Sequence, residues 1–178
     1  EKNQGTYLRL ISSPTSNAVL YLGKIITYLI ICLLQFYAIL LIAKLVFPFM
    51  QLPELNLSGN KVLLMSLLTL TAGLAAISLG ILLGIICKTQ EQSAPFGATF
   101  VVILAAIGGV WIPVFAMSDA MQVLSKTSPM NWALNGYYDI MLRNGSLIDI
   151  IPEMLLLTLF FAVLITFALL YDKKKRTV

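Results

Sequence analysis

The chain has 178 residues, of which 59% are hydrophobic and only 11% are charged. Soluble domains carry about 25% charged residues, and disordered chains are poor in apolar ones, so both classes are excluded. The mean hydropathy of +0.91 is typical of a membrane protein with several spans. The net charge of +4 comes largely from basic residues beside the last apolar run, so we expect no nucleic-acid partner.

The chain contains few of the residue types that commonly serve in catalysis or bind metal ions. There is no histidine, which removes the commonest general base and a common metal ligand. Cys32 and Cys87 both lie in apolar runs, where free cysteines are usually small buried hydrophobes. We therefore expect no catalytic residue, no metal site and no enzyme activity in this chain. The chain begins at Glu1 without an initiator methionine, which indicates a piece of a longer polypeptide.

Residues 1–16 precede the first apolar run and have an amphipathic pattern. Tyr7, Leu10 and Ile11 contribute an apolar stripe, whereas Glu1 and Arg9 are charged. This pattern predicts an amphipathic helix at the cytoplasmic face of the membrane, which by itself identifies no function.

The first predicted span covers residues 17–46, with a charge-free core between Lys24 and Lys44. A membrane helix needs about 20 apolar residues, and this run supplies them. Gln35 lies near its middle. An amide there can form an interhelical hydrogen bond or serve as a substrate ligand, and both interpretations remain open.

The second predicted span, residues 61–87, carries small residues at every fourth position. They are Ala72, Ala76, Gly80 and Gly84. A helix places residues four apart on one face, and small side chains allow two membrane helices to approach closely. This stripe predicts a helix-packing seam.

The third predicted span, residues 94–117, contains Pro113 near its outer end. Proline removes a backbone donor, so we expect it to kink or end the helix there. Residues 118–150 follow as outer-leaflet helices, one after Ser118 and one that begins at Ser128-Pro129 and stops at Asn144-Gly145. A surface loop folded over the bundle is the alternative.

The last predicted span covers residues 152–171, and the basic tail 172–178 follows it. The tail predicts a topological anchor that contacts anionic lipid headgroups; a specific protein partner is the alternative. Lys and Arg are denser in 1–24, 88–93 and 172–178 than in 44–61 and 119–153, which places both ends in the cytoplasm. The sequence thus predicts an all-α, polytopic membrane helix bundle with four transmembrane helices.

Several short motifs, taken in order, resemble the membrane-spanning permease subunits of type-2 ABC transporters. The first is Glu1-x-x-x-Gly5-Thr6, followed by a span that opens at Leu22-Gly23-Lys24. The later motifs are the inner loop 88–92, the pair Gly108-Gly109 before Pro113, and the run 128–132. The resemblance covers nearly the whole chain.

This resemblance implies a six-span exporter subunit of which the present chain supplies the last four spans. It also implies that the N-terminal amphipathic helix is a coupling helix that contacts an ATP-binding subunit. The coupling residues would be Glu1, Gly5, Thr6, Tyr7, Arg9, Leu10 and Ile11. The helices before the last span would then be short and re-entrant.

ATP and Mg²⁺ are expected on a separate ABC-type ATPase. A phosphate-binding Walker A loop needs Gly-x-x-x-x-Gly-Lys-Ser/Thr, whereas Gly23-Lys24 is followed by Ile25 and preceded by Ala18 at the first glycine position. Two permease subunits, identical or different, would form the path through the cytoplasmic membrane. A path lined by apolar residues would suit an amphipathic substrate such as a lipid, a drug or an antimicrobial peptide, and its polar contacts would include Gln35, Trp111 and Trp132. A non-transporting scaffold or sensor subunit is the alternative function.

Overall fold

The computed structural model describes residues 17–52, 57–87 and 89–176. These residues form helices, and no strand occurs among them. The long helices are α2 (Asn17–Phe49), α3 (Gly59–Ile86) and α7 (Leu147–Arg176), with the shorter α4 (Gln90–Ile107) between them in sequence. A 3₁₀ turn, η1 (Val114–Ala116), and two short helices, α5 (Asp119–Ser125) and α6 (Pro129–Met141), connect α4 to α7.

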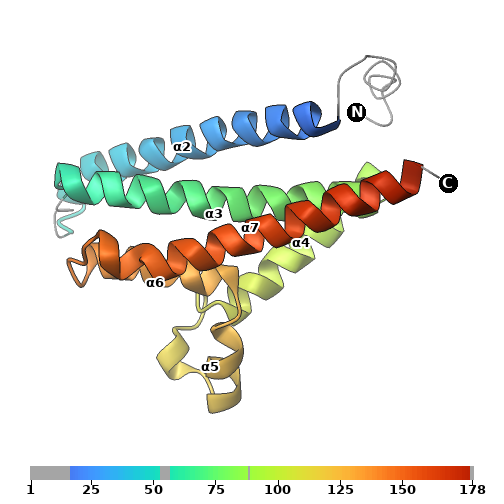
Figure 1. The fold of residues 1–178 in the computed structure, drawn as a ribbon. Helices are drawn as coiled ribbons and strands as arrows, with labels where there is room; N and C mark the ends of the chain where they lie inside the picture. The colour runs from blue at the N-terminus through green and yellow to red at the C-terminus, as the bar shows by residue number, and fades with distance from the viewer. Residues whose placement is uncertain (1–16, 53–56, 88, 177–178) are drawn as a thin grey trace.

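The prediction of a membrane helix bundle is confirmed. Within the described residues, α2, α3 and α7 are each long and apolar enough to cross a membrane, and α4 is a shorter apolar helix. The end of α2, the beginning of α3 and the turn between α6 and α7 lie at one end of the bundle (Figure 1). The beginning of α2 and the end of α7 lie at the other end.

The third predicted span differs most from the observed helix. Residues 94–117 were expected to be helical up to a break near Pro113, but α4 ends at Ile107. The break comes earlier because Gly109 has a φ of +89°, a left-handed conformation that glycine adopts without a steric penalty. The chain then turns away from the bundle axis, and η1 and α5 project to one side (Figure 1).

The centre of the bundle is α3, which packs against α2, α4, α6 and α7. The buried core joins one side of α3 to α6 and α7. Its members are Leu64, Met65, Leu68 and Ala75 of α3, Ile140 of α6, and Ile150 and Leu157 of α7. By contrast, α2 and α7 expose most of their apolar side chains, as expected of helices that face lipid or another subunit.

Candidate functional site: the α4–α6 junction and the interior hydroxyl groups

The break after α4 is closed by residues from the start of α6. A helix that ends leaves its last carbonyl groups without intrahelical donors, and the bilayer core offers no water to replace them. The Asn131 amide donates to the Gly108 carbonyl at 3.2 Å, and the Ser128 hydroxyl donates at 3.1 Å to the Leu104 carbonyl, which also accepts from the Gly108 backbone N–H. Ser128 and Asn131 are only 2% and 4% exposed. We call this contact the α4–α6 junction.

The sequence correctly predicts that a helix starts at Ser128-Pro129, but the serine hydroxyl, expected from its position to cap that helix, does not do so. Ser128 is the N-cap residue of α6 and Pro129 follows it, yet the serine side chain makes no capping hydrogen bond to α6. Its proton goes to α4 instead. The cap residue thus links two helices, because the Leu104 carbonyl, which already accepts from the Gly108 backbone N–H at 2.8 Å, accepts a second hydrogen bond from Ser128.

The junction is close-packed as well as hydrogen-bonded. A Cβ atom at Gly108 would lie 2.6 Å from the Cβ atom of Met130 and 3.0 Å from the Ser128 hydroxyl oxygen. The side-chain amide of Asn135 donates to the Asn131 side-chain oxygen at 3.0 Å, which orients the Asn131 amide toward α4. The glycine pair and the run 128–132, separate motifs in the sequence, are therefore two halves of one contact.

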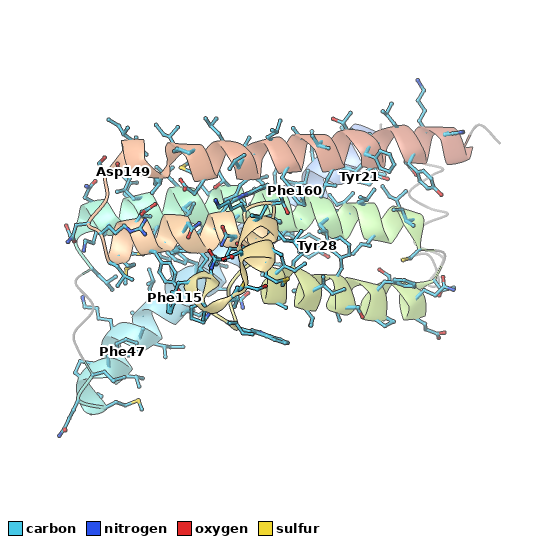
Figure 2. The ribbon with its side chains drawn as sticks, turned by 90° about the horizontal axis from the view of Figure 1, so that it is seen from below. Tyr21, Tyr28, Phe47, Phe115, Asp149 and Phe160 are labelled. Carbon is cyan, nitrogen blue, oxygen red and sulfur yellow. The ribbon has the colours of Figure 1, made fainter. Side chains whose placement is uncertain are left out.

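Trp132 lies on the inner side of α6. Its indole N–H donates to the Lys126 carbonyl at 2.7 Å, and its ring packs edge-on against Phe160 of α7 with ring centroids 6.3 Å apart. Phe160 lies on the side of α7 that faces α6 (Figure 2). Trp132 therefore ties α6 to α7.

Two tyrosine–hydroxyl pairs connect α3 to its neighbours. Tyr37 of α2 is 2.8 Å from Ser66, and Tyr137 of α6 is 2.7 Å from Thr69, measured between oxygens. Ser66 and Thr69 each use their own proton on a backbone carbonyl one turn earlier in α3. Each tyrosine must therefore be the donor of its pair.

The second pair is the more enclosed one. Tyr137 lies on the short helix α6, outside the long apolar helices, and burial raises the pKa of its hydroxyl group. The neutral hydroxyl is the form that can donate to Thr69. These groups place polar atoms within an otherwise apolar bundle.

The predicted packing stripe on α3 divides into two parts. Ala72 packs against the core, whereas Gly80 and Gly84 are exposed, with no described atom within 4 Å of an added Cβ. The close approach occurs one residue away, at Gly73, where a Cβ would lie 3.2 Å from the Cys32 sulfur of α2. The Ala76–Gly84 part of the stripe therefore forms no seam with the described helices, and its packing against a partner stays a prediction.

A second close approach was not foreseen from the sequence. A Cβ at Gly136 would lie 2.8 and 2.9 Å from the two terminal carbons of Leu68, so glycine lets α6 pack directly onto α3. The available signal was a glycine inside a helical pattern. Glycine is less favourable than alanine there by about 1 kcal/mol, so its presence indicates a position where packing requires a small residue.

The other predicted path residues lie on different elements. Gln35 is exposed on α2, and Trp111 is 65% exposed in the segment after α4. The structure does not bring Gln35, Trp111 and Trp132 into one lining in the described chain, because Trp132 is packed inside against α7. The predicted coupling residues between Glu1 and Ile11 lie outside the described residues.

The described residues contain no group of three or more His, Cys, Asp or Glu side chains that could hold a metal ion. What they do contain is a set of hydrogen-bonded and close-packed contacts that link helices to one another. Such an arrangement can transmit a movement of one helix to its neighbours.

Comparison with known proteins shows what this chain is similar to. No solved structure matches the chain. A curated relative, the linearmycin resistance permease protein LnrN of Bacillus subtilis, is 26% identical over 167 residues. The match covers 94% of this chain and 41% of that protein, so the chain spans less than half the length of its relative.

A family model described as "ABC-2 family transporter protein" matches residues 1–170. The resemblance found in the motifs is thereby confirmed, and the helical bundle is what a permease of this kind requires. The chain belongs to the ABC-2 family of transporter proteins and is part of a multi-pass membrane permease.

Proposed function

We propose that this chain is the C-terminal part of an exporter permease that moves an amphipathic substrate out through the cytoplasmic membrane. The observation that carries the proposal is the family match over residues 1–170. The name of the relative LnrN, a resistance permease, supports export of a toxic compound such as an antibiotic, a drug or a lipid. A separate ABC-type ATPase would supply the energy, with ATP and Mg²⁺ bound there.

Two copies of the permease, or two related subunits, would enclose the path. The exposed apolar faces of α2 and α7 support this part of the proposal, because a bundle so open is expected to have further helices around it. The interior hydroxyl groups of the two tyrosine pairs would offer the substrate polar contacts as helices separate.

The α4–α6 junction would couple the movements of two elements. α4 begins next to the inner loop and has 18 residues, about 27 Å in length, so as a fourth span it would stop short of the outer surface. Ser128 and Asn131 would make α6 follow α4. ATP-driven closure at the cytoplasmic face would then reach the outer half of the bundle.

The proposed topology has four spans, with both ends of the chain in the cytoplasm. The placement of the beginning of α2 and the end of α7 at one end of the bundle supports it (Figure 1). Residues 1–13 would form the coupling helix on that side, and Leu10 would be one of its apolar anchors.

Co-purification with the cognate ATPase tests the coupling proposal. Leu10→Asp should abolish recovery of the ATPase with the full-length permease, because loss of a buried interface anchor typically costs about 2 kcal/mol or more. Arg9→Ala is the matched control: a charge at the rim contributes less, so the complex should persist with less transport per ATP hydrolysed. Wild-type recovery and ATPase rate in Leu10→Asp would contradict the coupling assignment.

Transport itself is tested in cells that lack the gene. Expression of permease and ATPase together should lower the accumulation of a fluorescent amphipathic drug and raise resistance to antibiotics of that character. A variant ATPase unable to hydrolyse ATP should abolish both effects. Resistance that persists with the inactive ATPase would favour a scaffold or sensor role.

A further inference from the structure

Glu153 is an acidic side chain on the packed face of α7. Ile150 and Leu157, three residues before and four residues after it, are 0% and 1% exposed, and residues at these spacings share one side of a helix. Its carboxylate oxygen Oε2 is buried and has no hydrogen-bond partner among the described residues. The residue as a whole is only partly buried, although this oxygen itself is not exposed.

The position of Glu153 along α7 places it close to the level of lipid headgroups. α7 has 30 residues, a length of about 45 Å, which matches a bilayer of about 40–45 Å including its headgroup regions. Glu153 comes six residues after the start of α7, about 9 Å from that end. Asp149, near the same end, is exposed (Figure 2).

The contact between Trp132 and Phe160 sets the register of α6 against α7. Asp139 comes seven residues after Trp132 on α6, and Glu153 comes seven residues before Phe160 on α7. Seven residues make about two helical turns, so Asp139 and Glu153 lie at matching levels of the α6–α7 pair. Asp139 is already paired with a cationic side chain, because the Arg143 guanidinium group donates to its carboxylate at 2.6 Å. Glu153 forms no ion pair with the described residues.

The hydroxyl groups of the two tyrosine pairs cannot donate a hydrogen bond to Glu153, because each already donates elsewhere. Ser66 and Thr69 donate to backbone carbonyls, and the two tyrosines donate to Ser66 and Thr69. A carboxylate oxygen that is buried without a donor is strongly unfavourable in an apolar environment. The described residues therefore supply no donor for this oxygen of Glu153.

We propose that Glu153 binds a primary ammonium group that approaches from the outer leaflet. An ammonium group neutralises the carboxylate and has three N–H donors, which a quaternary ammonium lacks. Two sources share this chemistry at the level of Glu153: the headgroup of phosphatidylethanolamine and the amine of a free amphiphile. The choice of the outer leaflet rests on the proposed topology, whereas the binding itself is argued from α6 and α7 and does not depend on export.

Thermal unfolding of the full-length protein in nanodiscs tests the site. Nanodiscs of phosphatidylcholine alone are compared with nanodiscs that contain an equal part of phosphatidylethanolamine. We expect the wild type to melt about 4 °C or more higher with phosphatidylethanolamine. Glu153→Gln, which keeps the size but removes the charge, should abolish the difference. Asp119→Asn, a matched change of an exposed acid on α5, should keep it.

A second arm distinguishes the two sources of the amine. Dodecylammonium or dodecyltrimethylammonium is added to the phosphatidylcholine nanodiscs. The site is assigned to a free amphiphile if dodecylammonium raises the melting temperature of the wild type while dodecyltrimethylammonium and phosphatidylethanolamine do not. Glu153→Met should respond to neither probe and should melt at least as high as the wild type in phosphatidylcholine, because it removes the unpaired oxygen. Glu153→Gln that keeps either response, or a wild type that shows neither, would overturn the proposal.

Discussion

Replacing Gly108 with alanine tests whether the α4–α6 junction is held by close packing. The added Cβ would lie 2.6 Å from the Met130 Cβ atom and 2.7 Å from the Leu104 carbonyl oxygen. Neither atom can swing away, because one is attached directly to the α6 backbone and the other belongs to the backbone of α4. The start of α6 must therefore move outward to make room.

The expected loss of stability combines strain with weakened hydrogen bonds. Overpacking by one methyl group costs about 1–3 kcal/mol, and each hydrogen bond is worth about 1 kcal/mol. If the shift also weakens the bonds of Ser128 and Asn131 to α4, the total is about 2–4 kcal/mol. For a chain of 178 residues, that corresponds to a melting temperature lower by roughly 4–16 °C, and the shift is smaller in a longer full-length permease.

The assay is thermal unfolding of the full-length permease in nanodiscs, with Gly23→Ala as the matched control. Gly23 lies within α2, no described atom lies within 4 Å of a Cβ there, and alanine is favoured over glycine inside a helix by about 0.5–1 kcal/mol. Gly23→Ala should therefore melt at or slightly above the wild-type temperature. Equal melting temperatures for the wild type and Gly108→Ala would refute the close-packed junction.

Three further predictions concern the helix contacts and the topology. Tyr137→Phe should lower stability by only about 0.6 kcal/mol, because Thr69 keeps its bond to the backbone of α3; a loss of several kcal/mol on unfolding in nanodiscs would show that the pair does more than this bond. Gly80→Leu should leave the monomer folded but weaken subunit association in detergent, measured by light scattering; an unchanged dimer would remove the predicted seam. A single cysteine at Lys126, in a background without the native cysteines, should react with an impermeant thiol reagent in intact cells, whereas one at Thr89 should not; labelling at Thr89 would invert the proposed topology.

The sequence by itself determined the class of protein and the approximate helices. Charge-free runs of roughly 18–27 residues predict membrane helices whatever their neighbours are, because the bilayer requires backbone groups to be paired within each segment. Local signals also placed short elements well: Ser128-Pro129 begins α6, and Asn144, with a φ of 52°, turns the chain before α7. These features depend on residues adjacent in the chain.

Tertiary structure decided which residues connect the helices. Glycine permits a close approach wherever it occurs, so the spacing of small residues on α3 could not show that Gly73 meets α2 while Gly80 faces outward. A serine at a helix start can cap its own helix or bond to another, and only the position of the Leu104 carbonyl settled the second outcome for Ser128. Glu153 likewise becomes distinctive only because the helices packed around it bury one oxygen without supplying a donor. Each of these outcomes depends on distances between residues far apart in sequence, which periodicity along one helix does not encode.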